Sequence, residues 1–243
     1  MSASAPPVAG HVGAALPVIA VTGMAFEARI ARGNGVDTVF AARADLLEHA
    51  LNAAVARGCA GIISFGTAGG LAPDLEPGAL IVADAVDGPL GPISIDIAWS
   101  DRIAAALAAT QLASRLHRGP LAGVAAPLTG AADKAERHRS SGALAVDMES
   151  HLAGAIAHAH GLPFAVCRAV VDPAWRTLPP AATAGLRDDG STAIVPILRE
   201  LIKQPSQIRP LIQLAADARA ARAALVEARR ALEQAGALRL QSR

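Results

Sequence analysis

The stretch Ala-Val-Asp-Met-Glu-Ser at residues 145–150 leads from a short apolar run into a helical pattern through an acidic turn. In α/β sheets, ligands bind beyond the carboxyl ends of strands, where such turns lie. A carboxylate accepts hydrogen bonds from two neighbouring hydroxyl groups, and a thioether packs on the face of a ring. Glu149 and Met148 therefore predict a sugar site, with Val146 and Asp147 as further binding candidates.

Apolar runs on both sides of this stretch predict further strands, and helical patterns separate several of them. The predicted strands cover residues 18–21, 61–65, 79–83, 121–125, 143–146 and 164–171. The predicted helices cover residues 45–57, 101–116 and 150–160. This alternation predicts an α/β fold with a largely parallel or mixed sheet, because crossover helices join parallel strands.

The composition limits the class of protein. The 243 residues suit one domain, and 22 Lys and Arg against 21 Asp and Glu leave a net charge of +1. With 2% aromatic residues, the chain lacks the positive field and the stacking platforms of nucleic-acid-binding proteins. No run reaches the roughly 20 strongly apolar residues of a membrane-spanning helix. Cys59 and Cys167 lie far apart in apolar runs, so we expect reduced, buried thiols and a cytoplasmic protein.

Two segments flank the predicted catalytic domain at residues 17–205. Residues 1–16 contain no Asp, Glu, Lys or Arg and are interrupted by proline and glycine, so we expect a flexible tail. Residues 206–243 predict a long, basic amphipathic helix, which packs on the domain or a partner subunit, or else contacts a membrane surface. The arginines of this pattern are Arg209, Arg219, Arg222, Arg229, Arg230 and Arg239.

Polar residues that follow the predicted strands supply candidate chemistry. Residues 66–70 form a glycine-rich turn whose N–H groups, with the Thr67 hydroxyl, can hold an anion or sugar oxygens. Glu27 can activate water or anchor a hydroxyl, although a carboxylate is also ordinary in the first turn of a helix. Asp172 becomes a general acid if burial raises its pKa, although a turn carboxylate is equally ordinary there.

The remaining candidates concern anions, metals and nucleophiles. Arg29 and Arg168 can hold phosphate, and their alternatives are a surface position and a structural ion pair, respectively. The seven histidines show no zinc-binding spacing, so no metal is expected. The chain also has no G-x-S-x-G motif, which argues against a serine hydrolase.

Four ordered motifs resemble the purine nucleoside phosphorylase and methylthioadenosine nucleosidase superfamily over most of residues 17–200. These motifs are residues 23–27, 67–78, 145–150 and 168–172. Within the superfamily, residues 25–29, 147–151, 172–174 and 178–180 look most like the hopanoid-associated phosphorylase, which releases adenine from adenosylhopane. The resemblance implies a three-layer α/β/α phosphorylase/hydrolase-like fold with a mixed, partly barrel-like central sheet, and a homo-oligomer.

The resemblance also implies roles for individual residues. Glu149 would bind the ribose hydroxyls, Met148 would lie under the sugar, and Asp172 would protonate purine N7. Breaking the glycosidic bond leaves positive charge on the sugar and negative charge on the base, which these carboxyl groups relieve. The other implied substrate contacts are Val146, Asp147, Thr67, Ala68 and Gly69, and the implied phosphate contacts are Gly23, Arg29, Thr67 and Arg168.

The attacking nucleophile stays open at this point. Phosphorolytic relatives carry an arginine at the position of Ser64, whereas hydrolytic relatives carry a glutamate at that of Glu27 to activate water. Glu27 and Ser64 favour water, while the nearest family name favours phosphate as a co-substrate, with Arg29 or Arg168 compensating. No other cofactor is expected. Val171 replaces a serine that orients the acid in many relatives.

Two functional hypotheses follow. The first is an enzyme that cleaves the N-glycosidic bond of a purine nucleoside by phosphate or water attack at C1′, with adenosylhopane in hopanoid biosynthesis as the substrate. The second is a nucleoside-binding or scaffold protein of the same fold without efficient chemistry, motivated by Ser64 and Val171. A lipid-linked nucleoside would place the protein at the periphery of the inner membrane, with the basic helix at residues 206–243 on its surface.

Overall fold

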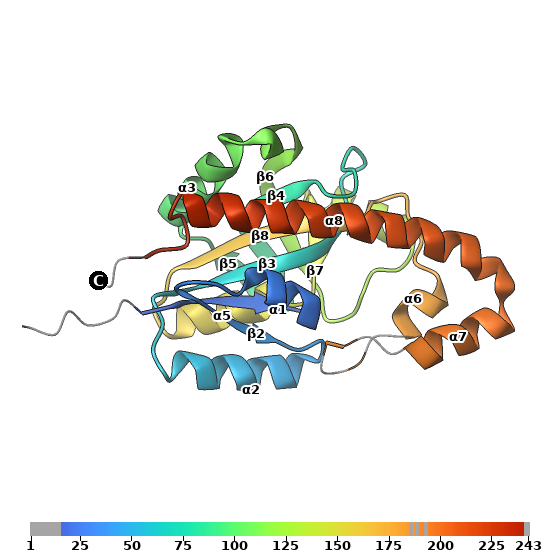
Figure 1. The fold of residues 1–243 in the computed structure, drawn as a ribbon, viewed down its shortest axis with the longest axis horizontal. Helices are drawn as coiled ribbons and strands as arrows, with labels where there is room; N and C mark the ends of the chain where they lie inside the picture. The colour runs from blue at the N-terminus through green and yellow to red at the C-terminus, as the bar shows by residue number, and fades with distance from the viewer. Residues whose placement is uncertain (1–15, 185–186, 188–189, 192–193, 241–243) are drawn as a thin grey trace, which may run out of the picture.

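The computed structural model describes residues 16–184, 187, 190–191 and 194–240. The predicted N-terminal tail lies outside the described residues, apart from Leu16. The described chain folds around one mixed sheet that has helices on both faces (Figure 1).

The sheet contains eight strands within the described residues. They are β1 (Val18–Thr22), β2 (Val36–Phe40), β3 (Gly61–Gly70), β4 (Leu80–Gly88), β5 (Gly91–Ser94), β6 (Leu116–Gly123), β7 (Ala145–Asp147) and β8 (Phe164–Asp172). Five of them close into a ring, because β8 pairs with both β3 and β4 while β7 and β6 connect the same two strands on the other side. The predicted mixed, partly barrel-like sheet is therefore confirmed.

The helices form the outer layers of the fold. They are α1 (Ala25–Ala31), α2 (Ala44–Val55), α3 (Ile97–Ala108), α4 (Ala131–Ser141), α5 (Ser150–Ala159), α6 (Pro180–Ala184), α7 (Ile194–Lys203) and α8 (Ile208–Gln234), with short 3-10 helices at Gln111–Arg115 and Pro205–Gln207. Helices α2 and α5 pack on one face of the sheet, and α1, α3 and α8 pack on the other (Figure 1).

Neighbouring residues of one strand belong to opposite hydrophobic cores. In β3, Ile62 contributes to the core beneath α2 and α5, whereas Ile63 contributes to the core beneath α3 and α8. In β8, Val166 and Cys167 divide in the same way. Since both faces of the sheet are covered, the strands are continuous apolar runs rather than alternating ones, which explains why the sequence showed them clearly.

Several predicted elements differ from those of the structure. Strands β2 and β5 and helices α4, α6 and α7 were not predicted, and the predicted helix at residues 101–116 is wrong beyond Ala108. The chain leaves α3 there because the Thr110 hydroxyl accepts a hydrogen bond from the Leu112 N–H group and begins a 3-10 helix, after which β6 starts at Leu116. The predicted turn at residues 66–70 is instead the last part of β3.

Helix α8 belongs to the core rather than to the surface over its carboxyl-terminal half. Its buried side chains face α1, α3 and β8, and they are Ala221, Ala224, Leu225, Ala228, Ala231 and Leu232. Arg229 is also buried, and its Nε donates to the Ala31 carbonyl at 2.8 Å. Arg229 is thus the buried arginine of α8, whereas Arg209, Arg219, Arg222 and Arg230 are exposed.

Candidate active site

Two glycines make room for charged side chains at the carboxyl edge of the parallel strands β1, β3 and β8. A Cβ atom on Gly23 would lie 2.5 Å from Glu149 Oε1. A Cβ atom on Gly66 would lie 2.7 Å from Arg168 Nη1 and 2.8 Å from Glu27 Oε2. Because real Cβ atoms do not approach other atoms so closely, only glycine permits these three ionisable groups to converge here.

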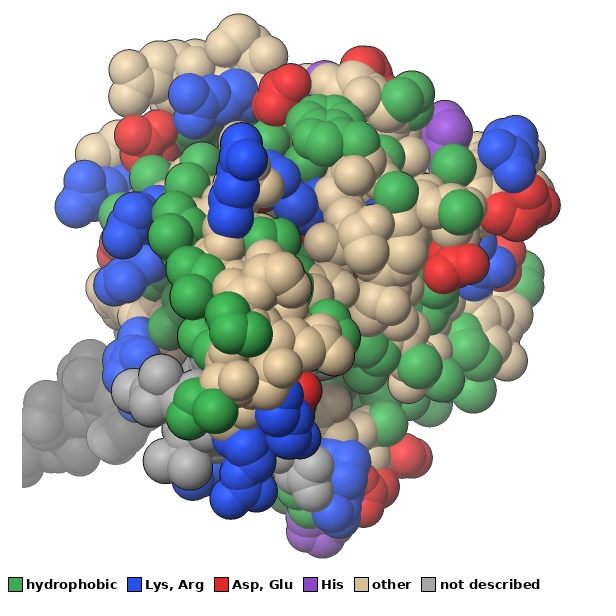
Figure 2. Space-filling model, turned by 90° about the vertical axis from the view of Figure 1, so that its right-hand side faces the viewer, with side chains coloured by type: hydrophobic (Ala, Val, Ile, Leu, Met, Phe, Trp, Pro, Cys, Tyr) green, Lys and Arg blue, Asp and Glu red, His purple; other side chains and the backbone are tan. Residues whose placement is uncertain are grey.

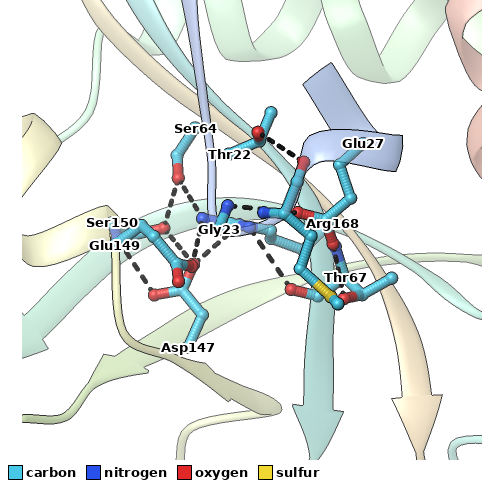
Figure 3. Close-up of polar contacts among 10 residues, drawn as sticks. Thr22, Gly23, Glu27, Ser64, Thr67, Asp147, Glu149, Ser150 and Arg168 are labelled. Carbon is cyan, nitrogen blue, oxygen red and sulfur yellow. Dashed lines mark hydrogen bonds and ion pairs between the residues drawn. The ribbon is translucent and has the colours of Figure 1, made fainter. Parts of the chain in front are cut away.

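Glu27 is buried at the start of α1, with 1% of its surface exposed. Its Oε2 accepts hydrogen bonds from the N–H groups of Gly23 and Met24 at 3.1 and 3.0 Å. Its Oε1 accepts from the N–H and hydroxyl groups of Thr67 at 2.8 and 2.6 Å (Figure 3). These four bonds hold the carboxylate between the β1–α1 turn and β3, in one orientation.

Arg168 extends from β8 into the same cluster and is fully buried. Its Nε lies 2.6 Å from Asp147 Oδ2, and its Nη2 lies 3.0 Å from Glu149 Oε2. Nη2 also donates to Ser64 Oγ at 2.6 Å, and Nη1 donates to the Thr67 carbonyl at 3.3 Å (Figure 3). The guanidinium is thus already engaged by two carboxylates, a hydroxyl and a carbonyl.

Asp147 and Ser150 anchor this cluster to the start of α5. Asp147 Oδ1 accepts from the Ser150 N–H at 3.0 Å, and its other oxygen accepts from the Ser150 hydroxyl. The Ser150 hydroxyl lies 2.8 Å from Ser64 Oγ. Because all three side chains are buried, they fix the position of Arg168 from behind.

Glu149 is the carboxylate whose environment is most unfavourable for charge. Burial raises the pKa of its carboxyl group to about 8, even though the neighbouring Arg168 acts in the opposite direction. The negative charges of Asp147 and Glu27 raise it further. The Glu149 carboxyl group therefore loses its proton only at raised pH, or when a bound ligand stabilises the negative charge.

Asp172 forms a second charged site at the end of β8. Its Oδ2 lies 2.5 Å from the Nζ atom of Lys134, which comes from α4 and is fully buried. The same Nζ donates to the carbonyls of Asp172, Pro173 and Arg176. Burial raises the pKa of the Asp172 carboxyl group, while the positive charge of Lys134 acts in the opposite direction.

Gly69 brings this second site close to the sugar-site candidates. A Cβ atom there would lie 3.2 Å from Val146 Cγ1 and 3.4 Å from Asp172 Oδ2. Gly69 pairs with Val146 across β3 and β7, and the register between β3 and β8 shifts between Ala68 and Gly69. The irregularity at this point pairs Gly69 with Asp172, so the carboxyl of Asp172 lies beside Gly69.

Comparison with known proteins places these motifs in a family. The family model of the Phosphorylase superfamily matches residues 4–193. The chain belongs to the Phosphorylase superfamily. Membership makes it an enzyme of the nucleoside phosphorylase and nucleosidase type.

Solved structures of nucleosidases share the fold. A 5′-methylthioadenosine/S-adenosylhomocysteine nucleosidase from Francisella philomiragia, described as putative, is 16% identical, with a TM-score of 0.60 over 90% of this chain and 98% of its own. A Helicobacter pylori MTAN variant with 5′-methylthioadenosine in its active site is 14% identical, with a TM-score of 0.62 over 92% and 99%. A futalosine hydrolase mutant from Helicobacter pylori is 16% identical, with a TM-score of 0.56 over 64% and 89%.

The structure brings together most of the residues that the superfamily resemblance singled out. Glu27, Thr67, Glu149 and Arg168 form one connected cluster, and Asp172 lies on the other side of Gly69. Met148 is partly exposed next to Glu149, whereas Val146 and Ala68 are buried in the sheet.

Of the residues expected to bind phosphate, Gly23, Thr67 and Arg168 lie together around Glu27, whereas Arg29 does not join them. Arg29 lies two residues after Glu27 on α1, which turns it to the opposite, exposed side of the helix. The Thr67 hydroxyl and the N–H groups of Gly23 and Thr67 are directed to Glu27, so they do not form an open anion-binding turn. Asp147 likewise faces Arg168 and Ser150 from inside the fold.

Sequence reasoning missed Lys134, the cation that contacts the superfamily's expected acid. It lies in a polar helical stretch between Asp133 and Glu136, where a lysine ordinarily faces solvent. The one feature of the sequence that indicated such a cation was Asp172 itself, because a buried carboxylate needs a positively charged or hydrogen-bonding partner. Nothing in the spacing from Lys134 to Asp172 indicated that the two side chains meet.

Proposed function

We propose that the chain hydrolyses the N-glycosidic bond of a purine nucleoside, and that its substrate is adenosylhopane, from which it releases adenine. The observation that carries this proposal is the placement of two different carboxyl sites on either side of the β3 glycines. Glu27, held beside Arg168, suits a water molecule at C1′, and Asp172, held by Lys134, suits the leaving base. Glu149 lies between β1 and Arg168, where it suits the ribose hydroxyls.

The proposed reaction forms a bond between the water oxygen and C1′ and breaks the bond between C1′ and purine N9. The bond electrons pass to the base, whose N7 receives the Asp172 proton, and Glu27 takes the proton that the water loses. Both Glu27 oxygens already accept two hydrogen bonds, but the Thr67 hydroxyl can rotate and free one lone pair for the water. The products are free adenine and the corresponding ribose derivative.

The charges around Arg168 favour water over phosphate. Glu27, Asp147 and Glu149 share this one guanidinium, and the negative charges of Glu27 and Asp147 already raise the pKa of Glu149, so a phosphate dianion would meet the same repulsion. Arg168 has also directed most of its donors to protein atoms, and Arg29 is exposed on another face. Neutral water meets neither obstacle.

The adenosylhopane assignment is supported by residues near Asp172 and by the residues that resemble the hopanoid-associated family. Trp175 follows Asp172 by three positions and is 48% exposed, so apolar surface lies close to the acid. Residues 172–174 and 178–180 are also among the positions that carry the resemblance. A nucleoside with an apolar 5′ substituent would use such a surface.

Adenine release tests the proposal directly. The purified chain is incubated with adenosylhopane, and separately with 5′-methylthioadenosine, with and without inorganic phosphate. We expect adenine release without phosphate and incorporation of water oxygen into the sugar product. Release that depends on phosphate would contradict hydrolysis, and adenosine binding without any release would instead support the non-catalytic hypothesis. Release from 5′-methylthioadenosine alone would refute the adenosylhopane assignment but retain the nucleosidase.

A further inference from the structure

The corner between α7 and α8 presents three isoleucines to solvent. Ile202 at the end of α7 is 82% exposed, and Ile208 and Ile212 in the first turns of α8 are 48% and 66% exposed. Ile208 and Ile212 are four residues apart, so they share one face of α8. Figure 1 shows that this corner projects from one end of the molecule, away from the sheet. We call these three residues the isoleucine corner.

Positive charge surrounds the isoleucine corner. Arg199, Lys203 and Arg209 are exposed beside it. Glu200 pairs with Lys203 and Asp217 pairs with Arg176, so these four charges cancel and Arg199 and Arg209 supply the local positive excess. Figure 2, which views this end of the molecule, shows hydrophobic side chains next to Lys and Arg side chains. The surface therefore combines apolar groups with a local excess of cations.

The loop after Asp172 lies against the same helix as part of this surface. Arg176 donates to Asp217 and to Gln213 of α8, which places the loop after Asp172 against the same helix as Ile212. The neighbouring Trp175 is 48% exposed. Tryptophan is favoured where apolar and aqueous environments meet, as at the surface of a lipid bilayer.

We propose that the isoleucine corner docks on an anionic lipid surface. The isoleucines enter the boundary between headgroups and acyl chains, and Arg199 and Arg209 contact the anionic headgroups. No helix among the described residues is long and apolar enough to span a bilayer. The docking proposal is independent of the proposed hydrolysis. Its functional consequence, access to a nucleoside whose tail is dissolved in the membrane, rests on the proposed hydrolysis.

The packing of α8 also determines which part of the basic segment at residues 206–243 is free to contact lipid. In the second half of α8, the apolar side chains are packed in the core and Arg229 is buried, so they are not free to contact lipid. Deleting residues 206–243 would therefore remove part of the core and is not a test of membrane binding. Point substitutions at the isoleucine corner leave the core intact because these side chains are exposed.

Vesicle co-sedimentation of the full chain tests the proposal. The vesicles contain phosphatidylcholine alone or phosphatidylcholine mixed with phosphatidylglycerol. We expect binding only to the anionic vesicles, and we expect the pair Ile202→Ser with Ile212→Ser to abolish it. The matched pair Leu90→Ser with Ile97→Ser, at two positions that are each 57% exposed elsewhere, should bind like the unmodified chain.

The charge contribution is tested separately with Arg199→Gln and Arg209→Gln. Two cations near headgroups correspond to a loss of affinity of roughly tenfold or more. The control pair Arg57→Gln with Arg102→Gln, also exposed, should change affinity little. Activity on a soluble nucleoside should be unchanged in all these variants, which separates failure of docking from failure of the proposed hydrolysis.

Two outcomes would overturn the proposal. One is an unmodified chain that binds neither kind of vesicle. The other is an isoleucine pair that binds vesicles normally but alters the molecular mass measured by light scattering, because the corner would then be an interface between copies of the chain.

Discussion

Lys134 and Asp172 form a buried ion pair in which the lysine side chain is fully closed to solvent. Burial raises the pKa of Asp172 and Lys134 counteracts it, so the lysine sets how far the carboxyl remains protonated. A group that must donate a proton loses activity as pH rises through its pKa. In Lys134→Met, we expect the high-pH limb of adenine release to move to higher pH, measured as kcat against pH. Lys134→Arg should largely restore the original limb, and an unmoved limb in the methionine variant would exclude this role.

Replacing the acid itself gives the largest expected effect on turnover. Asp172→Asn keeps the shape of the side chain but has no proton of suitable acidity, so kcat should fall by roughly 10² to 10⁴-fold. Asp101→Asn, at an exposed carboxylate on α3, is the control and should retain full activity. Equal activity of the two variants in the adenine-release assay would exclude Asp172 as the acid.

Glu149 makes a prediction about stability and pH. Its pKa is raised from 4.5 to about 8 in the fold, so the folded state binds a proton more tightly than the unfolded state does. The free energy of unfolding should therefore fall as pH rises between these two values. In Glu149→Gln this loss should be absent, whereas the exposed control Glu76→Gln should follow the unmodified chain. Urea unfolding across this pH range measures the difference, and identical slopes in all three proteins would contradict it.

At the scale of residues, the sequence indicated which side chains are functional candidates, because charged residues are uncommon directly after apolar strands. It did not indicate which side chains contact one another. Glu27, Glu149 and Asp172 follow apolar strands, and that placement alone marked them as candidates. Lys134 and the contact between Arg168 and Ser64 could not be predicted, because they depend on how separate elements pack in space.

At the scale of elements, β3 determines how closely the charged groups approach. A Cβ atom on Gly66 would collide with Arg168 Nη1 and the Glu27 carboxyl group, so Gly66→Ala must displace both side chains. We expect a loss of stability of about 1–3 kcal/mol and at least a tenfold loss of adenine release. Gly142→Ala is the control, because its φ of +67° makes alanine costly by about 1 kcal/mol while no atom lies within 4 Å. It should lose stability but retain activity.

Substitutions at two positions of α8 test whether one part of the helix is packed in the core and another part is exposed. Leu232 is fully buried, so Leu232→Ala should lower the free energy of unfolding by about 2–5 kcal/mol. Ile212, on the same helix, is 66% exposed, and Ile212→Ala should change it by less than about 0.5 kcal/mol. Urea unfolding monitored by circular dichroism compares the two, and equal values would mean that α8 packs differently.

At the scale of the whole molecule, the strong apolar runs predicted the fold class but not its connectivity. Each run is buried on both faces, which made β1, β3, β4 and β8 visible in the sequence. Strand β2, with exposed residues between buried ones, and the short β5 gave weaker signals. The pairing of β8 with two strands is a long-range choice that no local pattern specifies. Homo-oligomerisation stays a prediction, which light scattering can check.

The ring formed by β3, β7, β6, β4 and β8 also determines how slowly backbone amides exchange with deuterium. β8 has a hydrogen-bonded neighbour on each side, whereas β2 and β5 lie at the ends of the sheet path. Amides at residues 165–168 should therefore exchange only when the entire molecule unfolds, with the same free energy that urea unfolding reports. Amides of β2, β5 and the isoleucine corner should exchange sooner through local opening. Arg168 and Asp172 are thus carried by a strand that does not separate from its neighbours during ordinary fluctuations of the native protein.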